Sequence, residues 1–154
     1  MPAIPEILLI EDSADDRALF DRAVAASGMP LRVTHAASSP EAVMRLNRLG
    51  KYADTELPAV IVLDLSLPGL QGATLLQVVR NAYGPRDVPV VILTGSDNAA
   101  DQDACEPWDI SDYVVKPHAH SELVAFVRSL ARFLPSGKKQ ATTVIVRNNS
   151  KTGS

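Results

Sequence analysis

Short apolar runs alternate along this chain with segments whose apolar residues recur at helical spacing. The runs at 6–10, 59–64 and 90–95 are almost continuous and are bounded by turn-forming residues, which is typical of strands covered on both faces. Two shorter runs, at 31–36 and 112–115, are expected to be strands as well. Five strands alternating with helices predict an α/β protein built on a parallel sheet.

The segments between the strands carry signals for the start and end of helices. Ser13 is expected to cap a helix that ends at Gly28. Ser39, followed by Pro40 at the first helical position, is expected to cap a second helix that stops at Gly50. The remaining helices are expected over 73–82, in the segment that Pro107 ends, and over 121–134.

Crossover connections between parallel strands are right-handed, so the helices must be shared between the two faces of the sheet. The commonest five-stranded solution is the flavodoxin-like order 2-1-3-4-5, a doubly wound (βα)5 fold. Its ligand site lies at the carboxyl ends of the first and third strands, where the strand order reverses. We therefore expect any functional residues to follow these strands directly.

Polar side chains do follow the expected strands. Glu11 and Asp12 come after the first strand, Asp64 after the third, Thr94 at the end of the fourth and Lys116 after the fifth. Clustered carboxylates favour a bound cation, and hard oxygen ligands suit Mg²⁺. With an ammonium and a hydroxyl beside them, they predict a phosphoryl-transfer site in which Asp64 is the nucleophile.

Each of these residues has an ordinary explanation when it is taken alone. An aspartate after a strand is usually a helix cap or a turn former, and the segment from Asp64 to Gly69 could be simple turn chemistry. Thr94 could be structural, and Lys116 before Pro117 could be a solvated loop lysine. Their coincidence at the strand ends of one sheet favours a joint site.

The motifs that carry these residues resemble a known family. They are "IED" (10–12), "VLDLSLPGLQG" (62–72), "ILTGS" (92–96) and "YVVKP" (113–117), in the family's order and approximate spacing. From about residue 6 to residue 134 the chain resembles the receiver domain of two-component response regulators. The resemblance implies a phosphoprotein that accepts a phosphoryl group from a sensor histidine kinase and switches conformation to signal. It also implies that the chain catalyses only its own phosphorylation and dephosphorylation and is therefore not an enzyme in the usual sense.

The resemblance also assigns roles around the metal. It implies that Asp64 is the phosphoacceptor and that Glu11 and Asp12 form the acidic pair for Mg²⁺. Asp12 and Asp64 would be direct ligands, together with the backbone carbonyl of Ser66.

Three further positions concern the response to the phosphoryl group. Lys116 would pair with its oxygens, across a cis peptide bond to Pro117. Thr94 and Tyr113 would be the switch pair, with the hydroxyl moving toward the phosphate and the ring turning inward behind it.

The loop before the third strand refines the resemblance. With the segment "LGKYADTELPAVIVLDLSLPG", the chain is similar to the small regulators that partner bacterial phytochrome-type histidine kinases. Residues 1–135 are expected to form the receiver domain, and the residues after 134 are too few for a DNA-binding module, so a stand-alone regulator is expected. The 136–154 extension contains a β-branched run at 142–146, which predicts an exchanged strand arm in a homodimer.

The net charge and the cysteine content limit the classes of partner and the cellular compartment. The net charge is −3, with four cations and no acid in 136–154, which does not indicate a nucleic-acid or membrane partner. The first residues lack a basic signal-peptide region, no apolar stretch could span a bilayer, and the single cysteine, Cys105, excludes an internal disulfide. These features predict a cytoplasmic protein. Cys105 is expected to be a packing residue, and His118 and His120 to be loop histidines without a third metal ligand.

Three other classes share parts of this pattern. An aspartate-nucleophile phosphatase needs a second acid two residues after the nucleophile, and Ser66 stands there. A flavodoxin-like cofactor binder would present phosphate to the acidic loop "EDSADD", which would repel it. A receiver that docks without being phosphorylated would not need the intact acidic set.

Overall fold

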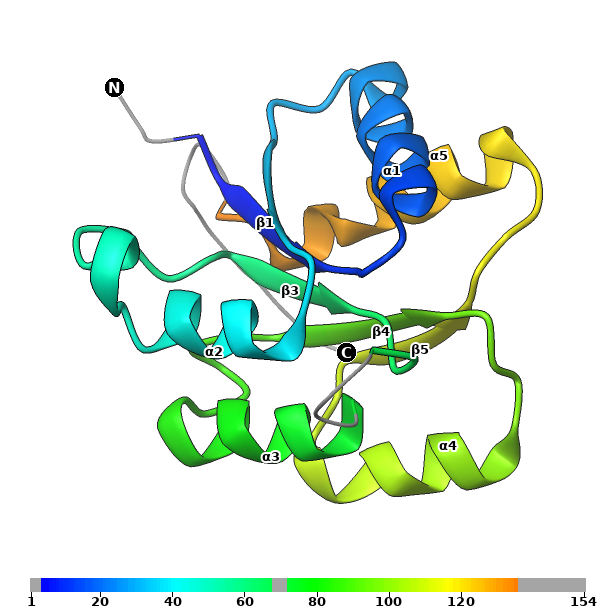
Figure 1. The fold of residues 1–154 in the computed structure, drawn as a ribbon. Helices are drawn as coiled ribbons and strands as arrows, with labels where there is room; N and C mark the ends of the chain where they lie inside the picture. The colour runs from blue at the N-terminus through cyan, green and yellow to red at the C-terminus, as the bar shows by residue number, and fades with distance from the viewer. Residues whose placement is uncertain (1–3, 68–71, 136–154) are drawn as a thin grey trace, which may run out of the picture.

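Five parallel strands form one sheet in the order β2-β1-β3-β4-β5 (Figure 1). The structure is a computed structural model, and it describes residues 4–67 and 72–135. The strands are β1 (Glu6–Ile10), β2 (Arg32–Ala36), β3 (Val60–Leu63), β4 (Val90–Thr94) and β5 (Asp112–Val115). The flavodoxin-like fold that the sequence predicts is therefore confirmed.

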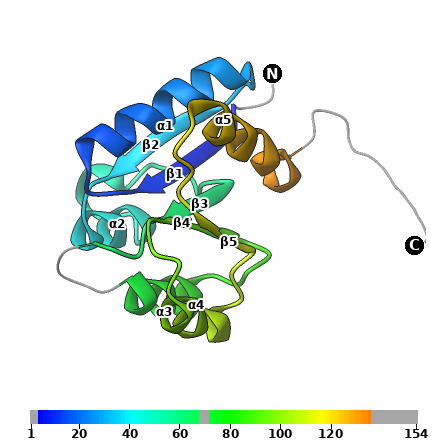
Figure 2. The same ribbon diagram turned by 90° about the vertical axis from the view of Figure 1, so that its right-hand side faces the viewer.

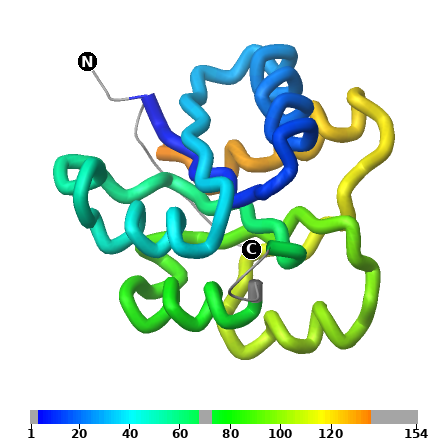
Figure 3. The backbone as a smooth tube through the Cα atoms, in the orientation of Figure 1, coloured from blue at the N-terminus to red at the C-terminus, as the bar shows by residue number. Residues whose placement is uncertain are grey.

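The helices lie on both faces of the sheet, as the handedness of the crossovers requires. They are α1 (Ala14–Ser27), α2 (Ser39–Leu46), α3 (Gly72–Ala82), α4 (Ala99–Cys105) and α5 (His120–Ser129), with 3₁₀ turns at Gly50–Tyr52, Glu106–Trp108 and Leu130–Phe133. Helices α1 and α5 pack together on one face, and α2, α3 and α4 cover the other, as Figure 2 shows. Figure 3 follows the chain through these crossovers.

The alternation of side chains along each strand divides the core into two layers. In β1, Ile7 and Leu9 pack with the residues of α1 and α5, whereas Leu8 and Ile10 pack with those of α2 and α3. All four side chains are almost completely buried. Because both faces are covered, the strand reads as a continuous apolar run in the sequence. The rigid sheet fixes the strand ends at which the polar residues begin.

The helix caps are predicted correctly at α1 and displaced at α2. Ser13 caps α1, and Gly28 ends it with a left-handed φ of 72°. At α2 the cap is Ser38, whose hydroxyl accepts the N–H of Glu41, so the expectation for Ser39 is wrong by one residue. Helix α2 also ends before Gly50, which starts the next 3₁₀ turn.

The carboxyl-terminal half differs from prediction in detail. Helix α4 ends at Cys105, and Pro107 lies in the 3₁₀ turn that follows, so the expected stop is confirmed. Helix α5 ends at Ser129, and the predicted helix over 121–134 is completed by a 3₁₀ turn. The described parts contain no helix long and apolar enough to cross a membrane. The predicted strand arm in 136–154 lies outside the described residues.

Candidate functional site

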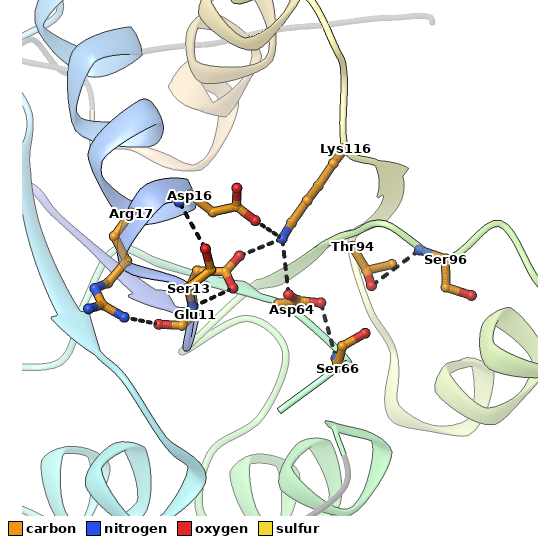
Figure 4. A network of polar contacts seen from close by, with 9 residues as sticks. All are labelled: Glu11, Ser13, Asp16, Arg17, Asp64, Ser66, Thr94, Ser96 and Lys116. Atoms are coloured by element: carbon orange, nitrogen blue, oxygen red, sulfur yellow. Dashed lines mark hydrogen bonds and ion pairs between the residues drawn. The ribbon is translucent and has the colours of Figure 1, made fainter. Parts of the chain in front are cut away.

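The polar residues predicted at the strand ends come together at the carboxyl edge of the sheet (Figure 4). The N–H of Asp64 donates to the carbonyl of Ile10 over 3.0 Å, which holds the end of β3 beside the end of β1. The N–H of Lys116 donates to the carbonyl of Thr94 over 2.7 Å, which holds the end of β5 beside that of β4. The backbone ladder thus places the side chains before any of them interacts.

The ammonium of Lys116 lies among three carboxylates. Its Nζ is 2.7 Å from Glu11 Oε1, 2.6 Å from Asp16 Oδ2 and 3.1 Å from Asp64 Oδ2. Burial acts to lower the pKa of Lys116, but hydrogen bonds to the three carboxylates outweigh it and raise the pKa. Lys116 is therefore a permanent positive charge next to Asp64.

Asp64 is a buried carboxylate next to this charge, with 4% of its surface exposed. Burial acts to raise its pKa, but hydrogen bonds from the Ser66 N–H, from Lys116 and from the Thr94 hydroxyl lower it. The Ser66 N–H donates to Asp64 Oδ1 over 3.0 Å, whereas Lys116 contacts Oδ2. Asp64 is therefore ionised at neutral pH, as a carboxylate nucleophile must be.

Glu11, Asp12 and Asp64 form a group of acids that could hold a metal ion. Each offers an oxygen, and these oxygens lie within 4.8 Å of one another. Glu11 is buried and Asp12 is exposed. Burial raises the pKa of Glu11 to about 7, with a contribution from the charge of Asp64, although Lys116 and Ser13 act against it. A set of carboxylate oxygens with this unfavourable crowding fits a hard divalent cation such as Mg²⁺.

Asp16 is the site residue that sequence reasoning missed. It lies in the first turn of α1, and its carboxylate contacts Lys116 at the shortest of the three distances. Its spacing from Asp12 gave no signal, because Asp12 precedes the cap at Ser13 and so lies outside the helix.

The two residues expected to form a switch lie on either side of the loop after β4. Thr94 is fully buried, and its Oγ1 accepts the Ser96 N–H at 3.5 Å. The half-buried Tyr113 donates its hydroxyl to the Ser96 carbonyl over 2.9 Å. Ser96 also donates its hydroxyl to Asp101 of α4 over 2.5 Å. The loop residue Ser96 thus connects Thr94, Tyr113 and α4.

Three other expectations have clear outcomes. The cis peptide bond before Pro117 is not present, because the described residues contain no cis bond; Lys116 reaches Asp64 with the trans bond that proline usually prefers. Cys105 is buried, and burial raises the pKa of its thiol, as expected of a packing residue. His118 and His120 are exposed and lie outside the acidic group. The role of the Ser66 carbonyl stays a prediction.

Comparison with known proteins agrees with this geometry. The family described as "Response regulator receiver domain" matches residues 7–128. The chain belongs to the response regulator receiver family. This is a family of signalling proteins.

Curated relatives of this receiver are longer proteins. The chain is 32% identical over 128 residues to the transcriptional regulatory protein PrrA of Mycobacterium tuberculosis, covering 83% of this chain and 50% of PrrA. It is 40% identical over 93 residues to the transcriptional activator protein IrlR of Burkholderia pseudomallei, covering 60% of this chain and 38% of IrlR. The chain therefore spans half or less of the length of these relatives.

Solved structures of similar length include regulators of phytochrome systems. The phosphorylated cyanobacterial phytochrome response regulator RcpA superposes with a TM-score of 0.75 at 31% identity, covering 85% of this chain and 94% of RcpA. The bacteriophytochrome response regulator AtBRR gives 0.71 at 31% identity, covering 90% of this chain and all of AtBRR. The Mn²⁺-bound response regulator Rcp1 gives 0.72 at 29% identity, covering 84% and 93%. The receiver is thus similar to phytochrome response regulators over most of its length.

Proposed function

We propose that this receiver accepts a phosphoryl group on Asp64 from the phosphohistidine of a sensor histidine kinase. An oxygen of Asp64 attacks phosphorus, the P–N bond to the histidine breaks, and the departing imidazole keeps the electron pair. The observation that carries the proposal is the buried, ionised Asp64 with the Lys116 ammonium 3.1 Å from its Oδ2. A carboxylate in this state is ready to react, and the cation beside it can stabilise charge on the transferred group.

The residues around Asp64 have separate roles in this proposal. Glu11, Asp12 and Asp64 would hold Mg²⁺, which when bound would neutralise charge on the transferring group. Lys116 would contact a phosphoryl oxygen, and the hydroxyl of Thr94 would turn from Asp64 toward the same group. Because Thr94 is tied to the loop at Ser96, such a movement would alter the position of α4.

A phytochrome-type kinase is the partner that the comparisons favour. RcpA is described as a cyanobacterial phytochrome response regulator, and RtBRR and AtBRR as bacteriophytochrome response regulators. The identities of about one third extend over 85–91% of this chain. We assign the receiver to a cytoplasmic phosphorelay with a kinase of this class.

We also propose that residues 1–135 are the receiver and that the 136–154 extension strengthens a homodimer. The extension lies outside the described residues, so the proposal is supported by its sequence. The β-branched run at 142–146 is an apolar strand former in a segment of otherwise polar residues. Exchange of such a strand with a second copy of the chain is a low-cost route to a two-fold dimer.

The test of phosphoryl acceptance is the intact mass of the protein after incubation with a small phosphodonor and Mg²⁺. We expect one added phosphoryl group that is labile to hydroxylamine, as an acyl phosphate is. Asp64→Asn should abolish the addition, and Asp54→Asn, an exposed acid in the loop before β3, should not. Full labelling of the Asp64→Asn variant would refute the assignment. No labelling of the wild-type chain would instead indicate a receiver that docks without phosphorylation.

A further inference from the structure

The ammonium of Lys116 has no hydrogen-bond donor left for a new partner. A lysine side chain carries three N–H donors, and the three carboxylate contacts, to Glu11, Asp16 and Asp64, occupy them. The contact with Asp16 is the shortest, at 2.6 Å, and the contact with the phosphoacceptor Asp64 is the longest, at 3.1 Å. A phosphoryl oxygen can therefore bind Lys116 only if one carboxylate gives up its contact.

The carboxylate of Asp16 is directed toward Lys116 by the local cap. In a capping box, the acid three residues after the capping serine accepts the backbone N–H of that serine. Here the Ser13 N–H donates to Glu11 Oε2 over 3.2 Å instead. The Ser13 hydroxyl still accepts the Asp16 N–H over 3.1 Å, which fixes the backbone of Asp16 and leaves its carboxylate to Lys116.

A cavity lies next to the Lys116 ammonium on the side of α1. A small cavity of about 50 Å³ lies between α1 and the loop after β5, and Asp16, Lys116 and Pro117 are among its lining residues, whereas Asp64 is not. Figure 4 shows the ammonium with Asp16 on the α1 side and Asp64 on the sheet side. Asp16 is also outside the acidic group of Glu11, Asp12 and Asp64. Of the three carboxylates that contact Lys116, Asp16 is thus the one outside the acidic group that could hold a metal ion.

We propose that Asp16 is a positioning residue that holds the Lys116 ammonium toward α1 and so opposes its contact with a phosphoryl group on Asp64. The inference rests on the proposed function of Asp64. In the resting state, Asp16 reduces the neutralisation of Asp64 by Lys116. In the phosphorylated state, the same carboxylate competes with the phosphoryl oxygens for the ammonium. Asp16 therefore weakens the phosphorylated state.

The test measures the affinity for beryllofluoride, a mimic of the phosphoryl group, at saturating Mg²⁺. Asp16→Asn removes the competing charge, so we expect the dissociation constant to fall by about two- to fivefold, the range typical of a partly exposed ion pair. The matched control is Asp15→Asn, an exposed acid in the same first turn of α1. It removes the same charge from the helix terminus and should leave the dissociation constant unchanged.

A second variant separates positioning from a general effect on the fold. Asp16→Glu keeps the carboxylate and should return the affinity toward the wild-type value, while the unfolding free energies of the Asp15 and Asp16 variants should agree. The inference would be overturned if Asp16→Asn binds beryllofluoride with the wild-type affinity or more weakly. It would also be overturned if Asp15→Asn shows the same gain in affinity as Asp16→Asn. If the wild-type chain takes up neither beryllofluoride nor phosphoryl, then the proposed function of Asp64 fails as well. Wild-type binding without an effect of Asp16 refutes the positioning role alone.

Discussion

Arg45 and Glu6 form an ion pair that is almost completely buried at the amino-terminal end of β1. Arg45 Nη2 lies 2.6 Å from Glu6 Oε2, and the two side chains are 4% and 7% exposed. The Thr34 hydroxyl donates to the same oxygen, whereas Arg45 Nη1 has no hydrogen-bond partner within the described part of the chain. The attraction between Arg45 and Glu6 therefore offsets only part of the desolvation cost of burying the two charges. The pair lies at the amino-terminal end of the strand, far from the phosphoacceptor.

This geometry predicts a large difference between single and double substitutions. Glu6→Gln leaves the buried guanidinium uncompensated and should lower the free energy of unfolding by about 3 kcal/mol. Replacing both residues together, Glu6→Leu with Arg45→Met, should cost less than either single change, because no buried charge remains. Urea denaturation measures both effects, with the exposed Glu56→Gln as the control. A double variant as unstable as Glu6→Gln would contradict the argument.

Protons and metal should compete for Glu11. Its pKa of about 7 in the metal-free site means that it gains a proton as the pH falls below that value. We therefore expect the affinity for Mg²⁺ to fall between pH 8 and pH 6, by up to about tenfold per pH unit. Isothermal titration at the two pH values measures the change, and Glu11→Gln should abolish most of the pH dependence.

The raised pKa of Glu11 also determines whether stability rises or falls with pH. The folded, metal-free chain binds this proton more tightly than the unfolded chain, because the pKa of Glu11 is raised from 4.5 to about 7. The contribution of Glu11 to stability is therefore full below pH 4.5 and is lost as the pH rises through about 7. Added Mg²⁺ should increase the stability most at the upper end of this window. A metal effect that is equal at pH 6 and pH 8 would contradict the role of Glu11.

The link from Thr94 to Tyr113 through Ser96 predicts how phosphorylation is transmitted. Tyr113→Phe removes the hydroxyl that donates to the Ser96 carbonyl and leaves the ring in place. Both Tyr113 and Trp108 pack against the core layer on the side of α3 and α4, and Trp108 is the only tryptophan in the sequence. Its emission should change when beryllofluoride binds the wild-type chain.

We expect this emission change to be reduced in Tyr113→Phe and in Thr94→Ala, because each variant uncouples the loop from the site. Thr94→Ser keeps the hydroxyl and is the matched control. The affinity for beryllofluoride must be measured alongside, so that a lost signal is not mistaken for lost binding. Full emission changes in both uncoupled variants, at saturating beryllofluoride, would argue against this switch.

The strand-end residues could be predicted because a parallel sheet gathers the carboxyl ends of its strands. Asp64, Thr94 and Lys116 each follow an apolar run, and the order of the runs is enough to bring them to one edge. No information on side-chain conformation is needed for that step. The contacts of Asp64 with Lys116 and of Ser66 with Asp64 then depend on short connections that the strands hold in place.

The contact between Asp16 and Lys116 could not be predicted in the same way. The two residues are 100 positions apart, and their contact depends on which acceptor Ser13 uses for its own N–H. The displaced cap of α2 has a similar cause, because Ser38 and Ser39 are equally good capping residues in the sequence. The choice is made by backbone conformation, since Ser38 is extended and Ser39 is already helical.

Truncation after Pro135 tests the proposed role of the 136–154 extension. We expect light scattering to show a dimer for the full chain and a smaller dimeric fraction for the truncated chain at the same concentration, because an apolar strand is lost. A second truncation after Arg147 retains the β-branched run and is the control. A monomeric full-length chain, or an unchanged dimer without the extension, would refute the proposal.

The last prediction concerns Arg80 of α3, whose guanidinium joins two loops. Its Nε donates to the Trp108 carbonyl over 2.7 Å, Nη1 to the Val88 carbonyl over 2.7 Å, and Nη2 to the Asp109 carbonyl over 3.3 Å. The planar fork of arginine supports all three bonds, whereas a lysine ammonium is a compact point charge without this fixed fork of donors. Arg80→Lys should therefore lower the unfolding free energy by about 1–3 kcal/mol.

The same substitution should also loosen the 3₁₀ turn that contains Trp108, because two of the three bonds end on that turn and the residue after it. We expect the tryptophan emission of the native variant to shift to the red, since the half-buried indole would gain contact with water. Arg128→Lys, on the exposed face of α5, is the control and should change neither quantity. If Arg80→Lys keeps the wild-type emission and stability, then Arg80 does not hold the turn, and the loop is maintained by the packing of Trp108 against the core.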